Sequence, residues 1–418
     1  MAGVADNDEI AAVLNYAAVL HKNGWTAEAY RVCQILVANG ISVDLPQIQS
    51  VVEGYSRLDP ATQGMGAHQP LAVMRGDQMF STLHLTSDLT DHQKRVAFKS
   101  GVGFINIETS SQCNRNCSYC PNSIYDRRKD NVFFDWPAYE RILDDLASID
   151  YSRRISLVGL NEPLMHLEDF VARLKAIRAR LPRCYILIFT NGDYLTKAAF
   201  TVMEECGVNE LKVAIHLSKD KLYDERDILK RTLDKSRELG LHPVLTNFTA
   251  DKEIEFRLSG SSMCVRYSQA NYMTEGNNRG EVLKGVGRKM AARTAACLQA
   301  MDNFIINYKG DVLPCCATIG SSPEVAPYVV GNVQGTSIFD IYCSEKFSAW
   351  RRDTMANGPK KRPCATCPEQ WGGFPQNWDA IVHKALAAVG AGNANPPPSS
   401  ATEMAPEFEG AGLSDRQL

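Results

Sequence analysis

The chain has 418 residues, 44% of them hydrophobic, and a formal net charge of −3 at pH 7. This hydrophobic content suffices for more than one packed domain, and the near balance of acidic and basic residues disfavours nucleic acid and anionic membrane surfaces as partners. The first residues lack the pattern of a signal peptide and no apolar stretch is long enough to span a membrane, so we expect a cytoplasmic protein.

The cysteines of this sequence are numerous and clustered. There are 13 of them, and the reducing cytoplasm disfavours a disulfide framework. Cys33, Cys184 and Cys206 stand singly in apolar segments, where we expect packed thiols. The clustered cysteines indicate metal or redox chemistry instead.

Residues 1–100 are predicted to form a helical region and a connector. Two stretches of helical periodicity between residues 8 and 58 each end in a glycine, which predicts a helical hairpin. The hairpin resembles a tetratricopeptide-type pair, and it is either a helical cap or a docking module for a protein partner. Residues 59–100 show no clear period and are predicted to be a connector.

Residues 101–260 alternate short apolar runs with helical segments. This alternation predicts parallel strands with right-handed crossovers, arranged as an open doubly wound sheet or a partial barrel. Both arrangements place functional loops at the carboxyl ends of the strands. The expected strands are 102–109, 154–160, 185–192, 211–217 and 242–248, and the expected helices are 136–147, 167–181, 197–207 and 226–240.

Residues 261–385 contain a second group of cysteines in what we predict to be a small α+β domain. Cys297 is followed by a strand pair that ends at Cys315 and Cys316, and Cys364 and Cys367 come later, so four thiols can converge. Residues 386–418 are rich in Pro, Gly and Ser and lack an apolar period, which predicts a disordered tail.

The stretch CNRNCSYC follows the first expected strand and offers three thiols, Cys113, Cys117 and Cys120. A structural zinc site takes four ligands, whereas an iron–sulfur cluster held by three cysteines keeps one iron open. Zinc or simple thiol packing is the alternative. With Tyr119 before the last cysteine, the stretch resembles the CxxxCxΦC signature of the radical S-adenosylmethionine (SAM) superfamily.

This resemblance implies a partial (β/α)6-type barrel, a [4Fe–4S] cluster on the three cysteines, and SAM bound to the open iron. In that family an electron from the cluster cleaves SAM, and the resulting 5′-deoxyadenosyl radical abstracts hydrogen from a substrate carbon. Tyr119 would contact the cofactor.

Two further loops resemble cofactor-binding segments of the family. The stretch VGLNEP is similar to its GGEP loop, in which Gly159, Glu162 and Pro163 match but Leu160 and Asn161 do not. The resemblance implies that Glu162 receives the amino group of SAM.

The stretch FTNG is similar to the family's TNG segment, which implies that Thr190 and Asn191 lie near the ribose. A simple Asn-Gly turn is the alternative for this stretch. His216 falls where relatives place a polar residue near the adenosine, and its alternative is a structural histidine.

The second cysteine group resembles the SPASM/twitch auxiliary-cluster domain. Cys297, Gly310 and Cys315, with twelve residues before the glycine, reproduce its C-x(9–15)-G-x(4)-C element, and Cys364 and Cys367 its CxxC. Because no cysteine follows Cys367, the resemblance implies one auxiliary [4Fe–4S] cluster on four thiolates, as in the twitch form. A zinc ribbon is the alternative. Three further cysteines stand outside this set. Cys264 has no assigned role, Cys316 can replace Cys315, and Cys343 falls on a helix expected over residues 338–350, where we expect it to be packed.

The resemblance implies a radical SAM oxidoreductase that draws electrons from a flavodoxin or ferredoxin. Twitch-type relatives include dehydrogenases of cyclitols, and we expect oxidation of a sugar, cyclitol or amino-acid derivative in natural-product or cofactor biosynthesis. The alternative is a peptide maturase that cross-links or epimerises a ribosomal precursor.

Arg279 is the candidate catalytic residue. It lies in NRG, residues 278–280, which resembles a segment found before the auxiliary cysteines of SPASM proteins. We prefer it to Arg266, which lies on an expected strand, because loops between rigid units carry most substrate contacts. A salt bridge between domains is the alternative role.

Overall fold

The computed structural model describes residues 81–129, 131–217, 223–288, 292–318, 320, 323–369 and 378–390. The predicted hairpin between residues 8 and 58 lies outside these residues, as does the predicted tail from residue 391 onward. The chain divides into two compact units, and of the described residues 81–212 and 272–390 belong to the larger unit and 213–271 to the smaller.

The larger unit is built on a mixed sheet. β1 pairs in parallel with both β2 and β8, while β9 runs antiparallel to β8 and β10 antiparallel to β9. The strand order is β10-β9-β8-β1-β2-β3-β4. The strands are β1 (Phe104–Ile107), β2 (Arg154–Ser156), β3 (Tyr185–Thr190), β4 (Glu210–Ala214), which crosses into the smaller unit, β8 (Asn303–Ile306), β9 (Asp311–Leu313) and β10 (Gly331–Asn332).

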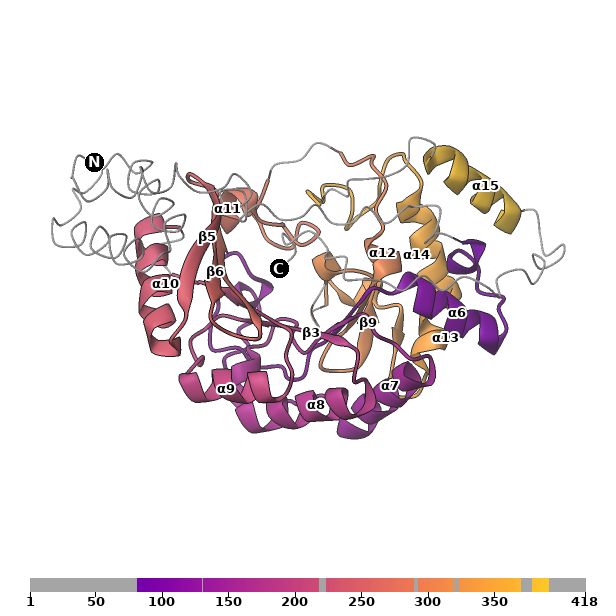
Figure 1. Ribbon diagram of the computed structural model, residues 1–418. Helices are drawn as coiled ribbons and strands as arrows, with labels where there is room; N and C mark the ends of the chain where they lie inside the picture. Colours follow the sequence, from indigo (N-terminus) through magenta and orange to yellow (C-terminus); the bar gives the residue numbers. More distant parts are fainter. Residues whose placement is uncertain are drawn as a thin grey trace, which may run out of the picture. The chain divides into compact units, whose positions relative to one another are not determined.

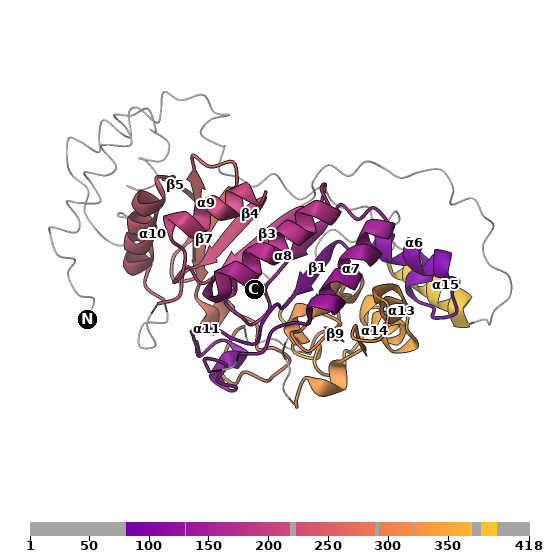
Figure 2. The ribbon, with the colours of Figure 1, turned by 90° about the horizontal axis from the view of Figure 1, so that it is seen from below.

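Three helices cover one face of this sheet, as expected from the β-α alternation. Figures 1 and 2 show α7 and α8 lying along the strands, with α9 next to them. The helices present buried apolar side chains to the sheet, as α7 does with Ile142, Leu143 and Leu146. They are α7 (Trp136–Ser148), α8 (Leu167–Arg180) and α9 (Lys197–Glu205).

A helix lies where we expected only a connector. α6 (Asp91–Gly101) begins at a capping box in which the Thr90 hydroxyl accepts from the Gln93 N–H and the Gln93 side chain accepts from the Thr90 N–H. Its Phe98 ring packs against Phe304 of β8 and against Phe339 and Tyr342. Packing against the carboxyl-terminal part of the chain therefore stabilises a segment whose own apolar period is weak.

The carboxyl-terminal segment adds short helices around β8. Cys343 was expected within one helix, but Ser344 caps a new one, so the segment forms α13 and α14 with Cys343 between them. The last helix continues to Gly390, past the predicted domain end at residue 385. These helices are α11 (Tyr272–Glu275), α12 (Gln299–Asp302), α13 (Ile338–Tyr342), α14 (Glu345–Met355) and α15 (Trp378–Gly390).

The smaller unit pairs α10 (Glu225–Leu239) with an antiparallel sheet. Its strands β5 (His242–Thr249), β6 (Glu253–Ser259) and β7 (Cys264–Ala270) follow each other in hairpin order. The run 242–248 was expected to continue the parallel series. It is a strand, but it pairs antiparallel with β6, because only a short turn joins the two strands, and another short turn joins β6 to β7.

Candidate functional site

The loops after β1, β2 and β3 lie at one edge of the larger sheet, because carboxyl ends of parallel strands meet there. The loop after β1 carries the three-cysteine motif, in which the Cys120 N–H donates to the Cys117 carbonyl (2.9 Å). The Arg115 N–H donates to the Cys113 sulfur (3.5 Å).

The three thiols form one electrostatic group. Burial, opposed by the Arg115 N–H and aided by the charges of Glu162, Cys120 and Cys117, raises the pKa of Cys113 to about 12. Burial also raises the pKa of Cys117 and of Cys120. Thiols of this kind ionise when cationic metal replaces their protons, so the three side chains fit an iron–sulfur cluster.

Tyr119 lies against this group. Its side chain hydrogen-bonds to Cys117, and its ring packs on that of Tyr272, with ring centroids 4.7 Å apart and planes tilted by 31°. The aromatic position of the motif is therefore beside the cysteines and in contact with the first residue of α11.

The predicted SAM-binding residues Glu162, Thr190 and Asn191 come together. The Glu162 carboxylate accepts from the Thr190 hydroxyl (2.6 Å), the Asn191 N–H (2.7 Å) and the Leu164 N–H (3.1 Å). Glu162 is 2% exposed, and burial raises its pKa to about 7. This buried carboxylate is suited to an ammonium ligand, because a positive charge would favour its ionised form.

Gly159 leaves room for the side chain of Glu108, a residue that the sequence did not single out. A Cβ at Gly159 would lie 2.8 Å from the Glu108 Cβ. Glu108, at the end of β1, is fully buried and accepts from Arg127 (2.7 Å), the Leu160 N–H (2.7 Å) and the Tyr308 N–H (3.2 Å). It thus joins the loops after β1 and β2 to the β8–β9 turn. An acidic residue closing an apolar strand was the available signal.

Asp193 is a second missed residue. Its carboxylate accepts from Asn114 Nδ2 (2.6 Å) and from both Arg115 Nε and Nη2 (2.6 Å each). Asn191 Nδ2 donates to Asn114 Oδ1 (2.7 Å). The TNGD segment therefore clamps the cysteine loop through the two residues that follow Cys113.

His216 and Arg266 belong to the smaller unit, so the cofactor contact predicted for His216 stays a prediction. His216 comes two residues after β4. Arg266, on β7, pairs with Glu255 of β6 at 3.8 Å. Cys264, also on β7, lies in this unit as well.

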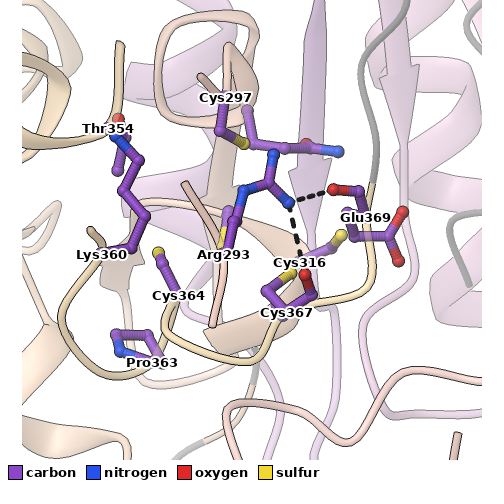
Figure 3. Close-up of a pocket in the computed structure, with 12 residues that line it drawn as sticks. Arg293, Cys297, Cys316, Thr354, Lys360, Pro363, Cys364, Cys367 and Glu369 are labelled. Carbon is purple, nitrogen blue, oxygen red and sulfur yellow. Dashed lines mark hydrogen bonds between the residues drawn. The ribbon is translucent and has the colours of Figure 1, made fainter. Parts of the chain in front are cut away.

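The predicted auxiliary ligands Cys297, Cys315, Cys364 and Cys367 line one cavity of the larger unit, together with Cys316 (Figure 3). They come from the turn before α12, the end of β9 and the turn after α14. Five thiols around one cavity fit an iron–sulfur cluster, whose four cysteine ligands bind four different irons.

Across the described residues, no three His, Cys, Asp or Glu side chains are arranged to hold a single metal ion. Cys343 is buried, with its sulfur 3.9 Å from the Lys94 carbonyl, and is packed as expected. Cys184 and Cys206 are also buried.

Arg279 lies beside the auxiliary cavity. Its backbone has φ 52°, and its Nη1 donates to the Cys316 carbonyl (2.8 Å). Burial raises the pKa of Cys120 and of Tyr272, and the Arg279 guanidinium opposes that rise in both. Arg279 is therefore within electrostatic reach of both cysteine groups, and within the described chain its hydrogen bond goes to a carbonyl rather than to a carboxylate.

Among the described residues, no helix combines the length and apolar character needed to cross a membrane.

Comparison with known proteins shows that the chain is similar to several enzymes, of which two are described here. An S-adenosyl-L-methionine-dependent 2-deoxy-scyllo-inosamine dehydrogenase of Niallia circulans is 28% identical over 250 residues, which cover 59% of this chain and 85% of the relative. A tungsten-containing aldehyde ferredoxin oxidoreductase cofactor-modifying protein of Pyrococcus furiosus is 20% identical, covering 59% of this chain and 83% of the relative. A crystal structure of BtrN with AdoMet and 2-DOIA matches with a TM-score of 0.48 and 23% identity, covering 66% of this chain and 97% of that one.

Family comparison accounts for both cysteine groups. The radical SAM superfamily model matches residues 107–250, and the SPASM model, an iron–sulfur cluster-binding domain, matches residues 297–368. The cofactors are accordingly a [4Fe–4S] cluster with SAM and an auxiliary iron–sulfur cluster. The chain belongs to the radical SAM superfamily, as an enzyme with a carboxyl-terminal SPASM domain.

Proposed function

We propose that this enzyme oxidises a small polar substrate, a sugar, cyclitol or amino-acid derivative, in natural-product or cofactor biosynthesis. The dehydrogenase of Niallia circulans supports this substrate class. The observation that carries the proposal is the auxiliary cavity, whose lining includes four cysteines at SPASM spacing. Hydrogen abstraction from an alcohol carbon leaves a radical, and a carbonyl forms when that radical loses one electron and the hydroxyl proton, so an electron acceptor is needed.

The cluster ligands of the first site are proposed to be Cys113, Cys117 and Cys120, which leave one iron for SAM. When bound, this cluster supplies the electron that cleaves SAM to the 5′-deoxyadenosyl radical, and the auxiliary cluster supplies an acceptor for one electron. Cys113 is buried and Cys117 and Cys120 are half-buried, which limits the contact of a bound cluster with water.

SAM is proposed to be oriented by Glu162, whose ionised carboxylate receives the amino group. Thr190 and Asn191 hold this carboxylate in place, since both donate to it. Tyr119 offers an aromatic face beside the cysteines, Gly159 leaves room for the loop, and His216 is proposed to contact the adenosine.

Arg279 is proposed to hold the substrate. A planar guanidinium can bind two oxygens of a polyol at once, and it stays charged, so it positions substrate rather than accepting a proton. Arg279→Lys should keep both clusters and slow substrate hydrogen abstraction about tenfold, or about 1.4 kcal/mol. A variant that abstracts hydrogen at the parent rate but melts earlier would instead support a structural role.

The electron donor is proposed to be a flavodoxin or ferredoxin in the cytoplasm. We also propose that the helices predicted in the amino-terminal hundred residues bind a protein partner.

The function is tested by incubating anaerobically reconstituted, reduced enzyme with SAM and candidate polyols deuterated at their alcohol carbons. A dehydrogenase transfers deuterium into 5′-deoxyadenosine and yields a ketone with two hydrogens fewer than the alcohol. An epimerase leaves the hydrogen count unchanged, and turnover only with a precursor peptide would overturn the proposal in favour of a maturase.

A further inference from the structure

Two cationic side chains line the auxiliary cavity, and the first is Arg293 (Figure 3). Arg293 is buried, with 6% of its surface exposed. Its guanidinium donates to the backbone carbonyls of Ala295 (3.2 Å), Ala296 (2.9 Å), Cys367 (3.4 Å) and Glu369. These carbonyls satisfy its donors but carry no net charge, so the positive charge is not neutralised by them.

The second cation is Lys360, which is half-buried. Its Nζ donates to the carbonyls of Asp353 (3.2 Å) and Ala356. Its backbone N–H donates to the Arg293 carbonyl (3.1 Å), and the Arg293 N–H donates to the Ala365 carbonyl (2.7 Å). The segment that carries Arg293 is thereby fastened to the turn that carries the last two cysteines.

Both cations lie beside the cysteines of the cavity. Arg293 and Lys360 line it together with Cys297, Cys364 and Cys367, and the Arg293 guanidinium reaches the Cys367 carbonyl (3.4 Å). The two positive charges are therefore next to the thiolates that would hold the cluster.

One carboxylate faces the same cavity. Glu369 lines it, and its side chain accepts from Asn277 Nδ2 (3.0 Å). Asn277 Nδ2 also approaches the Cys367 sulfur (3.9 Å). The cations Arg293 and Lys360 thus outnumber the carboxylate among the residues that line the cavity.

A cluster bound by four thiolates is anionic, and each added electron makes it more so. A nearby cation stabilises the more negative form, and it does so strongly where little water screens the charges. We propose that Arg293 and Lys360 are counter-charges that ease the one-electron reduction of the auxiliary cluster. This rests on the proposed function. There the first electron leaves the substrate with the abstracted hydrogen atom, the second electron passes to the auxiliary cluster, and the hydroxyl proton goes to solvent.

The test measures the midpoint potential of the auxiliary cluster alone, in the full chain with the first-site cysteines replaced by alanine. Arg293→Gln and Lys360→Gln each remove one charge, Arg293→Lys keeps it, and Lys361→Gln removes the same charge from an exposed neighbouring side chain. Each chain is reconstituted anaerobically, assayed for iron, titrated with dithionite and followed by electron paramagnetic resonance.

We expect Arg293→Gln and Lys360→Gln to make reduction about tenfold less favourable, which for one electron is about 59 mV toward negative potential. Arg293→Lys and Lys361→Gln should stay near the parent value. If Arg293 only fastens the segment, Arg293→Gln and Arg293→Lys will lower thermal stability alike and leave the potential unchanged, which overturns the proposal.

If both Arg293 variants lose the cluster, Lys360→Gln becomes the deciding variant, because this change removes only two hydrogen bonds to carbonyls. An unshifted potential there overturns the proposal. If the chain that carries only the first-site alanine replacements binds no auxiliary cluster, the proposed function fails as well. If the cluster forms but its potential is the same with and without the two cations, the counter-charge proposal alone fails.

Discussion

Glu162 is the residue whose charge the first site depends on. Burial raises its pKa from 4.5 to about 7, so below this pH the protonated form dominates and cannot attract an ammonium. We predict that SAM affinity falls as pH drops below about 7. In Glu162→Gln the affinity should be at least about tenfold weaker and nearly independent of pH. Equilibrium binding across this range checks both, and an equal pH dependence in parent and variant would exclude Glu162 as the cause.

The same carboxyl links pH to the stability of the ligand-free protein. Its pKa is higher in the folded state, so its contribution is fully present below about pH 4.5 and is lost as pH rises through about 7. We predict that Glu162→Gln unfolds at a higher urea concentration relative to the parent at about pH 8 than at about pH 5. A constant difference across these pH values would contradict the raised pKa.

Asp193 holds the cysteine loop by three hydrogen bonds to Asn114 and Arg115. Asp193→Asn removes the charge from a partly buried ion pair, and we predict a loss of about 1–3 kcal/mol in unfolding free energy together with weaker SAM binding. Asp126→Asn is the matched control, because Asp126 also pairs with an arginine at 2.6 Å but is exposed. If the two variants bind SAM equally well, the clamp has no role in positioning the loop.

At the scale of elements, the loop of residues 276–288 connects the site near Arg279 to the CxxC turn. Gly280 has φ 67°, and a Cβ there would lie 2.4 Å from the Pro363 Cβ, next to Cys364. Gly285 has φ 73° but nothing within 4 Å. We predict that Gly285→Ala costs about 1 kcal/mol for backbone strain alone. Gly280→Ala should cost more and also lower auxiliary iron, as measured by urea unfolding and iron assay.

Equal losses in the two glycine variants, with iron unchanged, would show that contact with Pro363 is unimportant.

The elements themselves followed their local patterns where capping and period agreed, as in α7 and α8. They departed where packing decided: α6 is stabilised by Phe98 against distant rings, and Ser344 divides one expected helix into two.

For the whole molecule, two cysteine groups predict about eight irons per chain as two four-iron clusters. Replacing Cys113, Cys117 and Cys120 together by alanine should halve the iron and abolish SAM cleavage. Replacing Cys364 and Cys367 should also halve it but spare some 5′-deoxyadenosine formation while removing oxidised product. Iron analysis and product assays of anaerobic protein check this, with melting curves as the control because clusters contribute folding energy. Stoichiometric zinc in place of iron would contradict the assignment.

The sequence by itself determined the family, the cofactors and the two cysteine groups, because cluster ligands must be cysteines at spacings that one loop or turn can close. It also singled out Glu162, Thr190 and Asn191, because the stretches that carry them resemble two cofactor-binding segments of the family. Only the tertiary structure decided which distant segments meet. Glu108, Asp193 and Arg293 are ordinary charged residues in the sequence, and their roles depend on partners from other segments, which local spacing does not encode.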